Sequence, residues 1–315
     1  MVMIFPINFF TNRLLPLLAT FLILALGAAP SVNAASGGQK SFTSPEKGAK
    51  SLLNAVKRDD IKKLVAILGP GSEPLITSGD EVADSSGRKE FVKRYEENNR
   101  IHPLDPTKSI LIIGRQEHPF PIPLVKVGKR WRFDTKEGKE EILNRRIGKN
   151  ELNAIEVARA YLVAQREYAC KDRDGDGAVA FAQRFRSHPG RRDGLFWEVK
   201  EGEGESPFGP LTAQAADEGY AENPRHAPYR GYLFKILKGQ GENAVGGTYS
   251  YLVNGKMILG FALVAYPAQY GASGIMTFIV NQSGVVYQKD LGESTGSVAP
   301  AMTSYDPDSS WRKTE

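Results

Sequence analysis

The residues with the clearest chemical pattern are three alternating aspartates, Asp172, Asp174 and Asp176, followed by Gly177. They fit D-x-D-x-D-G, the first half of an EF-hand-type calcium loop, in which alternating carboxylates place hard oxygen donors on one side of a turn and the glycine permits a sharp bend. The twelfth loop position holds Gln183 instead of the usual bidentate glutamate. Because that exchange removes one charge and one ligand oxygen, the pattern predicts weak calcium binding with a structural role.

The same residues also fit a plain polar turn. Aspartate carboxylates commonly accept hydrogen bonds from nearby backbone N–H groups, and Asp/Gly clusters are frequent in turns. Asp193 is a further candidate oxygen ligand if the chain folds back toward the loop. Two interpretations of this segment therefore stay open: a hydrogen-bonded turn, and a calcium site made by Asp172, Asp174, Asp176 and Gln183.

Other residue types used in catalysis occur without the arrangements that catalysis needs. Cys170 is the only cysteine, so the chain has no internal disulfide, and its place at the end of a helical pattern predicts a small buried side chain. Ser273 lies in Gly-Ala-Ser-Gly, but a nucleophile elbow needs glycine where Ile275 stands, so we predict a turn serine. Residues 239–244 match G-x-G-x-x-A but precede a strand pattern, which predicts a hairpin loop rather than a dinucleotide site.

The histidines and aromatic residues carry no specific site signal. The four histidines lack the spacing of zinc ligands, and three directly precede proline, so we predict surface loops for His102, His118, His188 and His226. Aromatic residues cluster between Phe196 and Tyr270. On strands such residues usually fill a core, whereas an exposed aromatic face would stack on the sugars of a glycan.

The first 34 residues have the pattern of a secretory signal peptide. Arg13 precedes an apolar run over residues 14–28, and small residues lead to a predicted cleavage site after Ala34. The run is shorter than the roughly 20 residues that a membrane span needs. We therefore expect a periplasmic or secreted protein of the bacterial envelope, with membrane attachment only through an uncleaved signal anchor.

Composition predicts a folded, two-domain protein. Hydrophobic residues make up 41% and charged residues 24% of the chain, a globular rather than a disordered profile. The net charge is +5 with both signs interspersed, so no basic, aromatic-interleaved surface for nucleic acid is expected. Residues 35–315 exceed one small core, and we predict domains over residues 42–148 and 149–315.

Apolar periodicity indicates the elements of each domain. In the first, two short helices lie between Ser44 and Gly69, and a third starts near Ser86. Strand patterns follow at residues 109–113, 121–127 and 130–133, and a short charged helix is predicted at residues 137–147. A break at residues 148–150 sets the predicted domain boundary.

The second domain begins with a long helix from Glu151 to about Cys170, followed by an irregular stretch with a short helix near residues 178–185. An antiparallel meander then covers residues 231–237, 247–253, 259–266, 274–280 and 285–289. The expected fold class is α+β: an N-terminal domain of helices on a curved antiparallel sheet, and a C-terminal domain of a long helix plus a meander.

Three resemblances add to this. Residues 42–148, with "LLNAVKRDDIKKLVAIL" and "GKRWRFD", resemble nuclear-transport-factor-2-like domains, a fold that hosts both enzymes and non-enzymatic pockets. Residues 149–315 resemble type IV pilin and pseudopilin heads in "GYLFKIL" and the strands after it, but the long helix lacks the membrane-spanning half, so pilus assembly is not implied. The mature chain is identified as a member of the family domain of unknown function 2950 from "YLVAQREYACKDRDGDG", "GYLFKILKGQG" and "YPAQYGASGIMTF", which implies no known activity.

The leading functional expectation is an exported, non-enzymatic scaffold or binding module, with an envelope protein or a glycan as partner and calcium as the one possible cofactor. The first alternative is a hydrolase of envelope material that uses a pocket in the N-terminal domain with carboxylates such as Asp80, Asp84 or Asp134. The second alternative is a pilus- or secretion-associated subunit.

Overall fold

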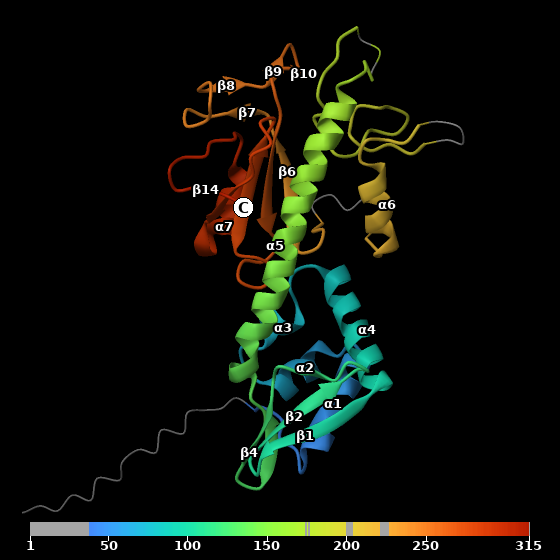
Figure 1. Ribbon diagram of the computed structural model, residues 1–315, viewed down its shortest axis with the longest axis vertical. Helices are drawn as coiled ribbons and strands as arrows, with labels where there is room; N and C mark the ends of the chain where they lie inside the picture. Colours follow the sequence, from blue (N-terminus) through green and yellow to red (C-terminus); the bar gives the residue numbers. More distant parts are fainter. Residues whose placement is uncertain (1–37, 174, 176, 200–203, 221–226, 315) are drawn as a thin grey trace, which may run out of the picture. The chain divides into compact units, whose positions relative to one another are not determined.

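A single long helix, α5 (Thr135–Tyr168), connects two antiparallel sheets along the chain in the computed structural model of the protein (Figure 1). The structure describes residues 38–173, 175, 177–199, 204–220 and 227–314, so the predicted signal peptide lies outside the described residues. None of the helices in this described part combines the length and apolarity that a bilayer crossing requires. The fold class is α+β, as predicted.

Four helices precede the first sheet: α1 (Pro45–Lys57), α2 (Ile61–Leu68), α3 (Glu73–Ile76) and α4 (Glu81–Glu97). The predicted start of α1 is confirmed, because the Ser44 hydroxyl accepts a hydrogen bond from the Lys47 N–H at 3.4 Å. Helix α4 begins earlier than the predicted Ser86. Its N-cap is Asp80, whose carboxylate accepts a hydrogen bond from the Ala83 N–H at 3.0 Å.

The first sheet has the strand order β1-β2-β4-β5, with β3 on β2, and all its pairs are antiparallel. Its strands are β1 (Asn99–Asp105), β2 (Lys108–Ile113), β3 (His118–Pro119), β4 (Leu124–Val127) and β5 (Arg130–Phe133). Strand β1 was not predicted, and it places His102 in a strand rather than a loop. Its side chains are almost all exposed, so pairing with β2 rather than an apolar pattern holds it in the sheet.

Side chains fill the space between these helices and the sheet. The rings of Phe91 and Phe120 lie 5.6 Å apart, and those of Phe120 and Phe133 lie 6.3 Å apart, both edge to face. Ile67 from α2 and Leu124 from β4 are fully buried in the same cluster. The first half therefore has a packed hydrophobic core of its own.

The second sheet has the order β14-β13-β12-β11-β6, again antiparallel. Its strands are β6 (Tyr232–Leu237), β11 (Ala262–Pro267), β12 (Met276–Asn281), β13 (Tyr287–Asp290) and β14 (Arg312–Lys313). Between β13 and β14 lie η1 (Gly292–Ser294) and α7 (Thr295–Ala301). Strands β11 and β12 are almost entirely buried, which is why their predicted positions were close to the observed ones.

Two predictions for this half were wrong, and one helix was not predicted. Residues 247–253 form no strand of the meander, but belong to short hairpins made by β7 (Gly239–Gln240), β8 (Tyr249–Ser250), β9 (Leu252–Val253) and β10 (Lys256–Met257). Residues 178–185 are not helical, since Phe181 bridges to Met257 instead. A helix that was not predicted, α6 (Gly209–Asp217), follows in the loop-rich stretch.

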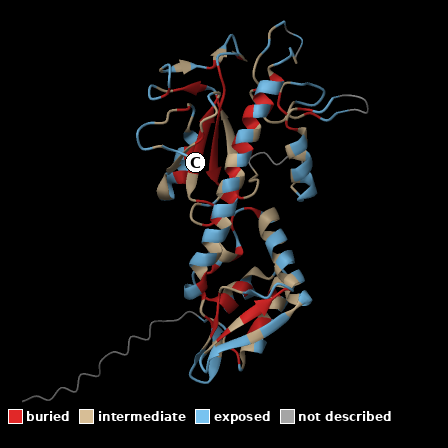
Figure 2. Ribbon diagram, in the orientation of Figure 1, coloured by how far each residue is buried: buried red, intermediate tan, exposed pale blue. Residues whose placement is uncertain are grey.

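Helix α5 passes through residues 148–150 without the predicted break. Its first turns pack on the first half, where the Thr135 hydroxyl donates a hydrogen bond to the Leu68 carbonyl at 2.5 Å. Its last turns bury Tyr161 and Leu162 in the core under the second sheet. Buried residues occur in both parts of α5, among them Gly138 and Ile147 in the first part and Ala158 in the second, and Figure 2 colours the helix by burial. Helix α5 continues through Gly148 because these tertiary contacts outweigh the low helix propensity of glycine. Residues 148–150 therefore do not mark a domain boundary, and the division into residues 42–148 and 149–315 stays a prediction.

Candidate functional site

The acidic loop is described in part. Asp174 and Asp176 lie outside the described residues. The two carboxylate oxygens of Asp172 accept hydrogen bonds from the N–H groups of Gly175 and Gly177, each at 2.8 Å. These contacts reach three and five residues along the chain, so the carboxylate holds the backbone of the loop around itself.

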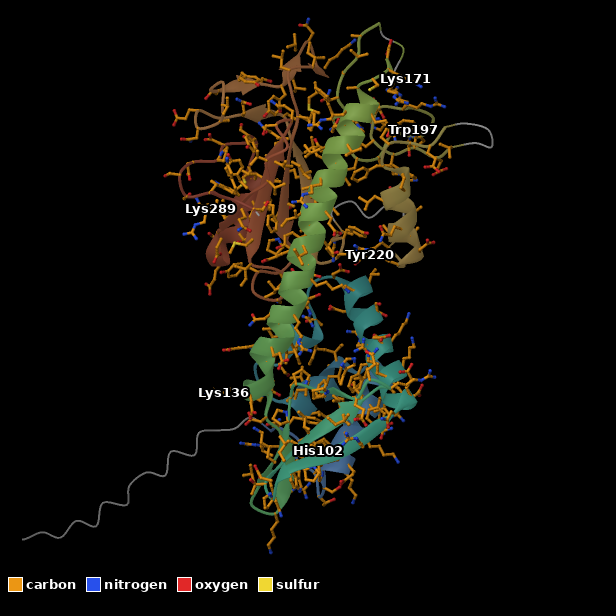
Figure 3. All side chains as sticks on the ribbon, in the orientation of Figure 1. His102, Lys136, Lys171, Trp197, Tyr220 and Lys289 are labelled. Carbon is orange, nitrogen blue, oxygen red and sulfur yellow. The ribbon has the colours of Figure 1, made fainter. Side chains whose placement is uncertain are left out.

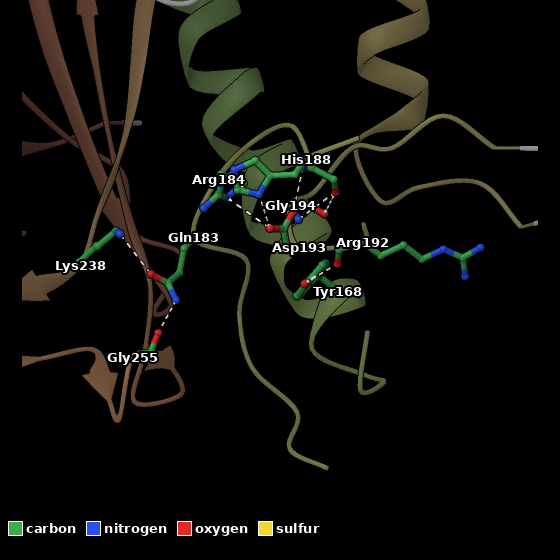
Figure 4. Close-up of polar contacts among 10 residues, drawn as sticks. Tyr168, Gln183, Arg184, His188, Arg192, Asp193, Gly194, Lys238 and Gly255 are labelled. Carbon is green, nitrogen blue, oxygen red and sulfur yellow. Dashed lines mark hydrogen bonds and ion pairs between the residues drawn. The ribbon is translucent and has the colours of Figure 1, made fainter. Parts of the chain in front are cut away.

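Gln183, the proposed last ligand, takes part in other contacts (Figure 4). Its side-chain N–H donates to the Gly255 carbonyl at 2.7 Å, and its amide oxygen accepts from the Lys238 ammonium at 3.1 Å. Among the described residues, no group of three or more acidic, histidine or cysteine side chains converges as a metal site. Calcium binding by Asp172, Asp174, Asp176 and Gln183 therefore stays a prediction.

Asp193 binds His188. The His188 ring nitrogen Nδ1 lies 2.6 Å from one carboxylate oxygen, and the His188 N–H donates to the other at 2.9 Å (Figure 4). Burial raises the pKa of Asp193, but these two hydrogen bonds and the nearby Arg184 outweigh it and lower the pKa. His188 is exposed in a loop, as predicted.

Three further predictions have clear outcomes. Cys170 is exposed, not buried, because α5 ends just before it and turns its thiol out of the core. Ser273 is a buried turn serine whose hydroxyl exchanges hydrogen bonds with the backbone of Gln269 at 2.9 and 3.1 Å, as expected. Residues 239–244 lead from β7 into the hairpin with β8, also as expected.

The carboxylates proposed for a hydrolase are dispersed over helix ends. Asp80 caps α4, and Asp134 stands at the N-cap position of α5. Asp84 accepts hydrogen bonds from the N–H and the hydroxyl of Ser78, both at 2.8 Å. The contacts of Asp80 and Asp84 cap and tie down chain segments, which is a structural use of a carboxylate, whereas the Asp134 side chain makes no capping hydrogen bond.

Asp80 also joins the two halves of the described chain. It is 1% exposed, and its second carboxylate oxygen accepts hydrogen bonds from the Tyr220 hydroxyl at 2.9 Å and from the Gly231 N–H at 2.7 Å. Tyr220, labelled in Figure 3, follows α6 and lies opposite the start of α4. Gly231 has φ of 82°, a conformation that favours glycine and directs its N–H at the carboxylate. Burial and the Asp80 charge raise the pKa of Tyr220, so the phenol stays protonated as a donor.

A pocket of about 530 Å³ opens beside this junction. Helices α5 and α6, strand β6 and the loop around Phe196 supply most of its wall, and Pro300 of α7 closes one side. The lining is mainly apolar and aromatic, and includes Phe185, Phe196, Phe208, Leu211, Leu233 and Phe234. A concave, mostly apolar cavity with a few polar groups is the usual form of a small-molecule site.

The polar groups of the pocket differ in how they are used. The Tyr220 hydroxyl binds Asp80, and the Thr212 hydroxyl donates to the Phe208 carbonyl at 2.9 Å. The Tyr229 hydroxyl is buried and makes no hydrogen bond within the described part of the chain. Burial raises the pKa of Tyr229, although the Arg230 charge works in the opposite direction. The two cations of the lining are Arg186 and Lys235.

Sequence reasoning did not identify this pocket, because its lining is drawn from residues 157 to 300 and forms no local motif. The one available signal was the aromatic cluster between Phe196 and Tyr270, of which Phe196, Tyr229, Phe234 and Tyr266 face the pocket. Their alternation on strands predicted a core or a sugar-stacking face, and it could not distinguish either from a cavity wall.

Comparison with known proteins bears on the whole chain. No curated protein and no solved structure matches it. Residues 39–314 match a family described as "Protein of unknown function (DUF2950)". This range covers both sheets, helix α5 and the pocket, and it agrees with the family predicted from the sequence. The chain therefore belongs to the DUF2950 family.

Proposed function

We propose that this protein is an exported, non-enzymatic binding protein whose pocket between α5, α6 and β6 takes a small apolar or amphipathic molecule. The observation that carries the proposal is the pocket itself, about 530 Å³ with an aromatic and aliphatic lining. Removing apolar surface from water is favourable by about 25 cal/mol per Å², so such a wall favours a ligand with an apolar body. The signal-peptide pattern of residues 1–34 supports a role outside the cytoplasm.

The site favours binding over chemistry. Its polar residues are the phenols of Tyr220, Tyr229 and Tyr266, the Thr212 hydroxyl and two cations, and of these the Tyr220 phenol binds Asp80 and the Thr212 hydroxyl binds a backbone carbonyl. General acid–base catalysis needs a titratable group within hydrogen-bond reach of a reacting atom. The carboxylates and the exposed His188–Asp193 pair lie outside this lining.

The finer structural likenesses belong to the same proposal. Helices α1, α2 and α4 beside a curved antiparallel sheet support a nuclear-transport-factor-2-like arrangement for residues 42–148. The long helix α5 packed on β11 and β12 supports a pilin-head-like arrangement for residues 149–315. An experimental structure compared with both folds tests this, and a different strand order in either sheet would remove the likeness.

Binding is tested with a neutral fluorescent dye, N-phenylnaphthylamine, added to the purified protein. We expect a saturable rise in fluorescence that Ala215→Trp abolishes, because Ala215 lines the pocket and the larger ring fills it. Ala216→Trp is the matched control, since Ala216 is exposed on the same helix. Saturable binding of equal strength in both variants would place the dye elsewhere, and the absence of binding would contradict the proposal.

A further inference from the structure

We propose that the ligand of this pocket is an anionic amphiphile, an apolar chain or ring that ends in a carboxylate or phosphate, with its head at Lys235. The inference rests on the proposed function and adds the charge of the ligand to it.

The charged side chains in the described part of the wall are both cations. Of the described residues that line the pocket, Arg186 and Lys235 carry a positive charge and none carries a negative one. In a cavity with little water, a charge acts more strongly than at the open surface, because the effective dielectric constant is lower. An anionic head would therefore be attracted and a cationic head repelled, while the apolar wall accepts the rest of the ligand.

Lys235 is the better placed cation. Its ammonium donates hydrogen bonds to the carbonyls of Pro300 and Met302, at 2.6 and 2.7 Å, at the end of α7. Both acceptors are neutral, and an ammonium has three donors, so one N–H and the full positive charge remain for a ligand. None of the ion pairs within the described residues involves Lys235. The carbonyl contacts also hold the long side chain in place, which reduces the entropy lost when an anion binds.

Arg186 is a secondary contributor. Its guanidinium pairs with Glu198 at 2.8 Å and lies 4.9 Å from the centre of the Phe196 ring. The Glu198 side chain is 77% exposed, so water and salt weaken that pair. A ligand head that approaches Arg186 would compete with an exposed carboxylate, whereas at Lys235 it would replace no ionic partner.

The buried hydroxyl of Tyr229 is a further polar group of the pocket wall. A buried hydroxyl without a partner destabilises a protein by about 1–3 kcal/mol. A bound head group or a water that it carries would supply an acceptor after a small shift of the ring. The unsatisfied donor and the two cations thus favour the same chemistry, an oxygen-rich anion.

The test compares ligands that share one apolar chain and differ in the head group. Dodecanoate, dodecyl phosphate, dodecanol and dodecyltrimethylammonium are titrated into the purified protein below their micelle concentrations, with displacement of N-phenylnaphthylamine as the readout. We expect at least one of the two anions to bind about tenfold more tightly than the alcohol, which corresponds to one charge-assisted hydrogen bond. The cation should bind more weakly than the alcohol. The two anionic arms distinguish a carboxylate from a phosphate ligand.

Lys235→Met should reduce the preference for the anion over the alcohol to less than about threefold and leave the affinity for the alcohol nearly unchanged. The matched control is Lys238→Met, because Lys238 lies just beyond the same strand and binds Gln183 instead of the pocket. Lys235→Arg, which keeps the charge, should retain most of the preference, and thermal unfolding of each variant confirms that it is folded.

The outcomes separate the two proposals. If the alcohol binds the unchanged protein as tightly as both anions do, the anionic ligand is wrong and the apolar pocket stands. If Lys235→Met and Lys238→Met weaken anion binding equally, the assignment of the head group to Lys235 is wrong. If neither the dye nor any dodecyl compound binds, the proposed function fails and the inference fails with it.

Discussion

Asp80 and Asp172 are both aspartates that accept hydrogen bonds from backbone N–H groups, but they differ in the reach of their contacts. Asp172 is exposed and accepts from Gly175 and Gly177, three and five residues away. Asp80 is buried and accepts from Tyr220 and Gly231, 140 and 151 residues away. The local contacts shape one turn, whereas the distant contacts hold two halves of the chain together. The more conspicuous sequence motif is therefore the less important one for the fold.

The largest expected effect comes from removing the Asp80 carboxylate. Asp80→Ala leaves Ala83 N–H, Tyr220 O–H and Gly231 N–H without their acceptor in a buried site. We expect the free energy of unfolding to fall by about 3–5 kcal/mol, because each stranded donor costs about 1–3 kcal/mol before relaxation. Urea unfolding followed by circular dichroism measures the loss. Asp172→Ala is the control, with an expected loss near 1 kcal/mol or less, and equal losses would remove the contrast between the two aspartates.

A smaller effect is expected from single hydroxyls near Asp80. Tyr220→Phe removes a donor to Asp80 and an acceptor for the Arg230 N–H at 3.0 Å, and should lower the free energy of unfolding by about 1–2 kcal/mol. Tyr229→Phe is the matched control on the neighbouring ring, 4.9 Å away between centroids. Because its hydroxyl has no partner in the described part of the chain, its removal should not lower the free energy of unfolding and should raise it by about 1 kcal/mol. A larger loss in Tyr229→Phe than in Tyr220→Phe would contradict the assignment of the junction.

The next prediction concerns Asp172 and tests whether the acidic loop binds calcium. The calcium hypothesis predicts that millimolar calcium raises the free energy of unfolding by about 1 kcal/mol. The rise should be lost in Asp172→Asn and should be absent with magnesium at the same concentration, since magnesium demands a stricter octahedral geometry. Differential scanning calorimetry with calcium and then with a chelator measures it. Unchanged midpoints would leave the hydrogen-bonded turn as the full account of Asp172.

The smallest expected effect is the pH-dependent contribution of the Glu218–Arg230 ion pair to the free energy of unfolding. The hydrogen bond from Arg230 is the main cause that lowers the pKa of Glu218 below its ordinary value of 4.5. The folded state therefore favours the carboxylate, so its contribution is present above pH 4.5 and is lost as the pH falls through the lower pKa of the folded protein. Since the Glu218 side chain is 34% exposed, we expect only about 0.5 kcal/mol. Urea unfolding should show Glu218→Gln to be less stable than the unchanged protein at pH 7 but not at pH 3. An equal loss of stability at both pH values would show that the effect does not come from the ion pair with Arg230.

The predictions from sequence succeeded where the signal is local and repeated. The helix start at Ser44 was correct because its cap lies within one turn. Strands β11 and β12 were placed closely because both faces are buried and apolar. The hairpin at residues 239–244 and the turn at Ser273 were correct because a Gly-rich segment next to a strand pattern leaves few alternatives.

The failures share one physical cause, which is that distant contacts replaced local preference. Strand β1 is almost entirely exposed and exists through pairing with β2. Residues 178–185 have helical composition, but Phe181 and Gln183 bind the segment at residues 255–257 instead. Helix α5 continues through Gly148 because its two ends pack on different cores.

The α+β class, the family, helices α1, α2 and α4 and the central strands could be predicted from the amino-acid sequence, since these follow from periodicity, capping and motifs read over short stretches. The position of the candidate site could be found only in the folded structure. The pocket lining, the Asp80 junction and the contact of Lys235 with α7 each bring together residues that are far apart along the chain. Such convergence leaves no local pattern, because each residue fits its own helix or strand equally well with or without the others.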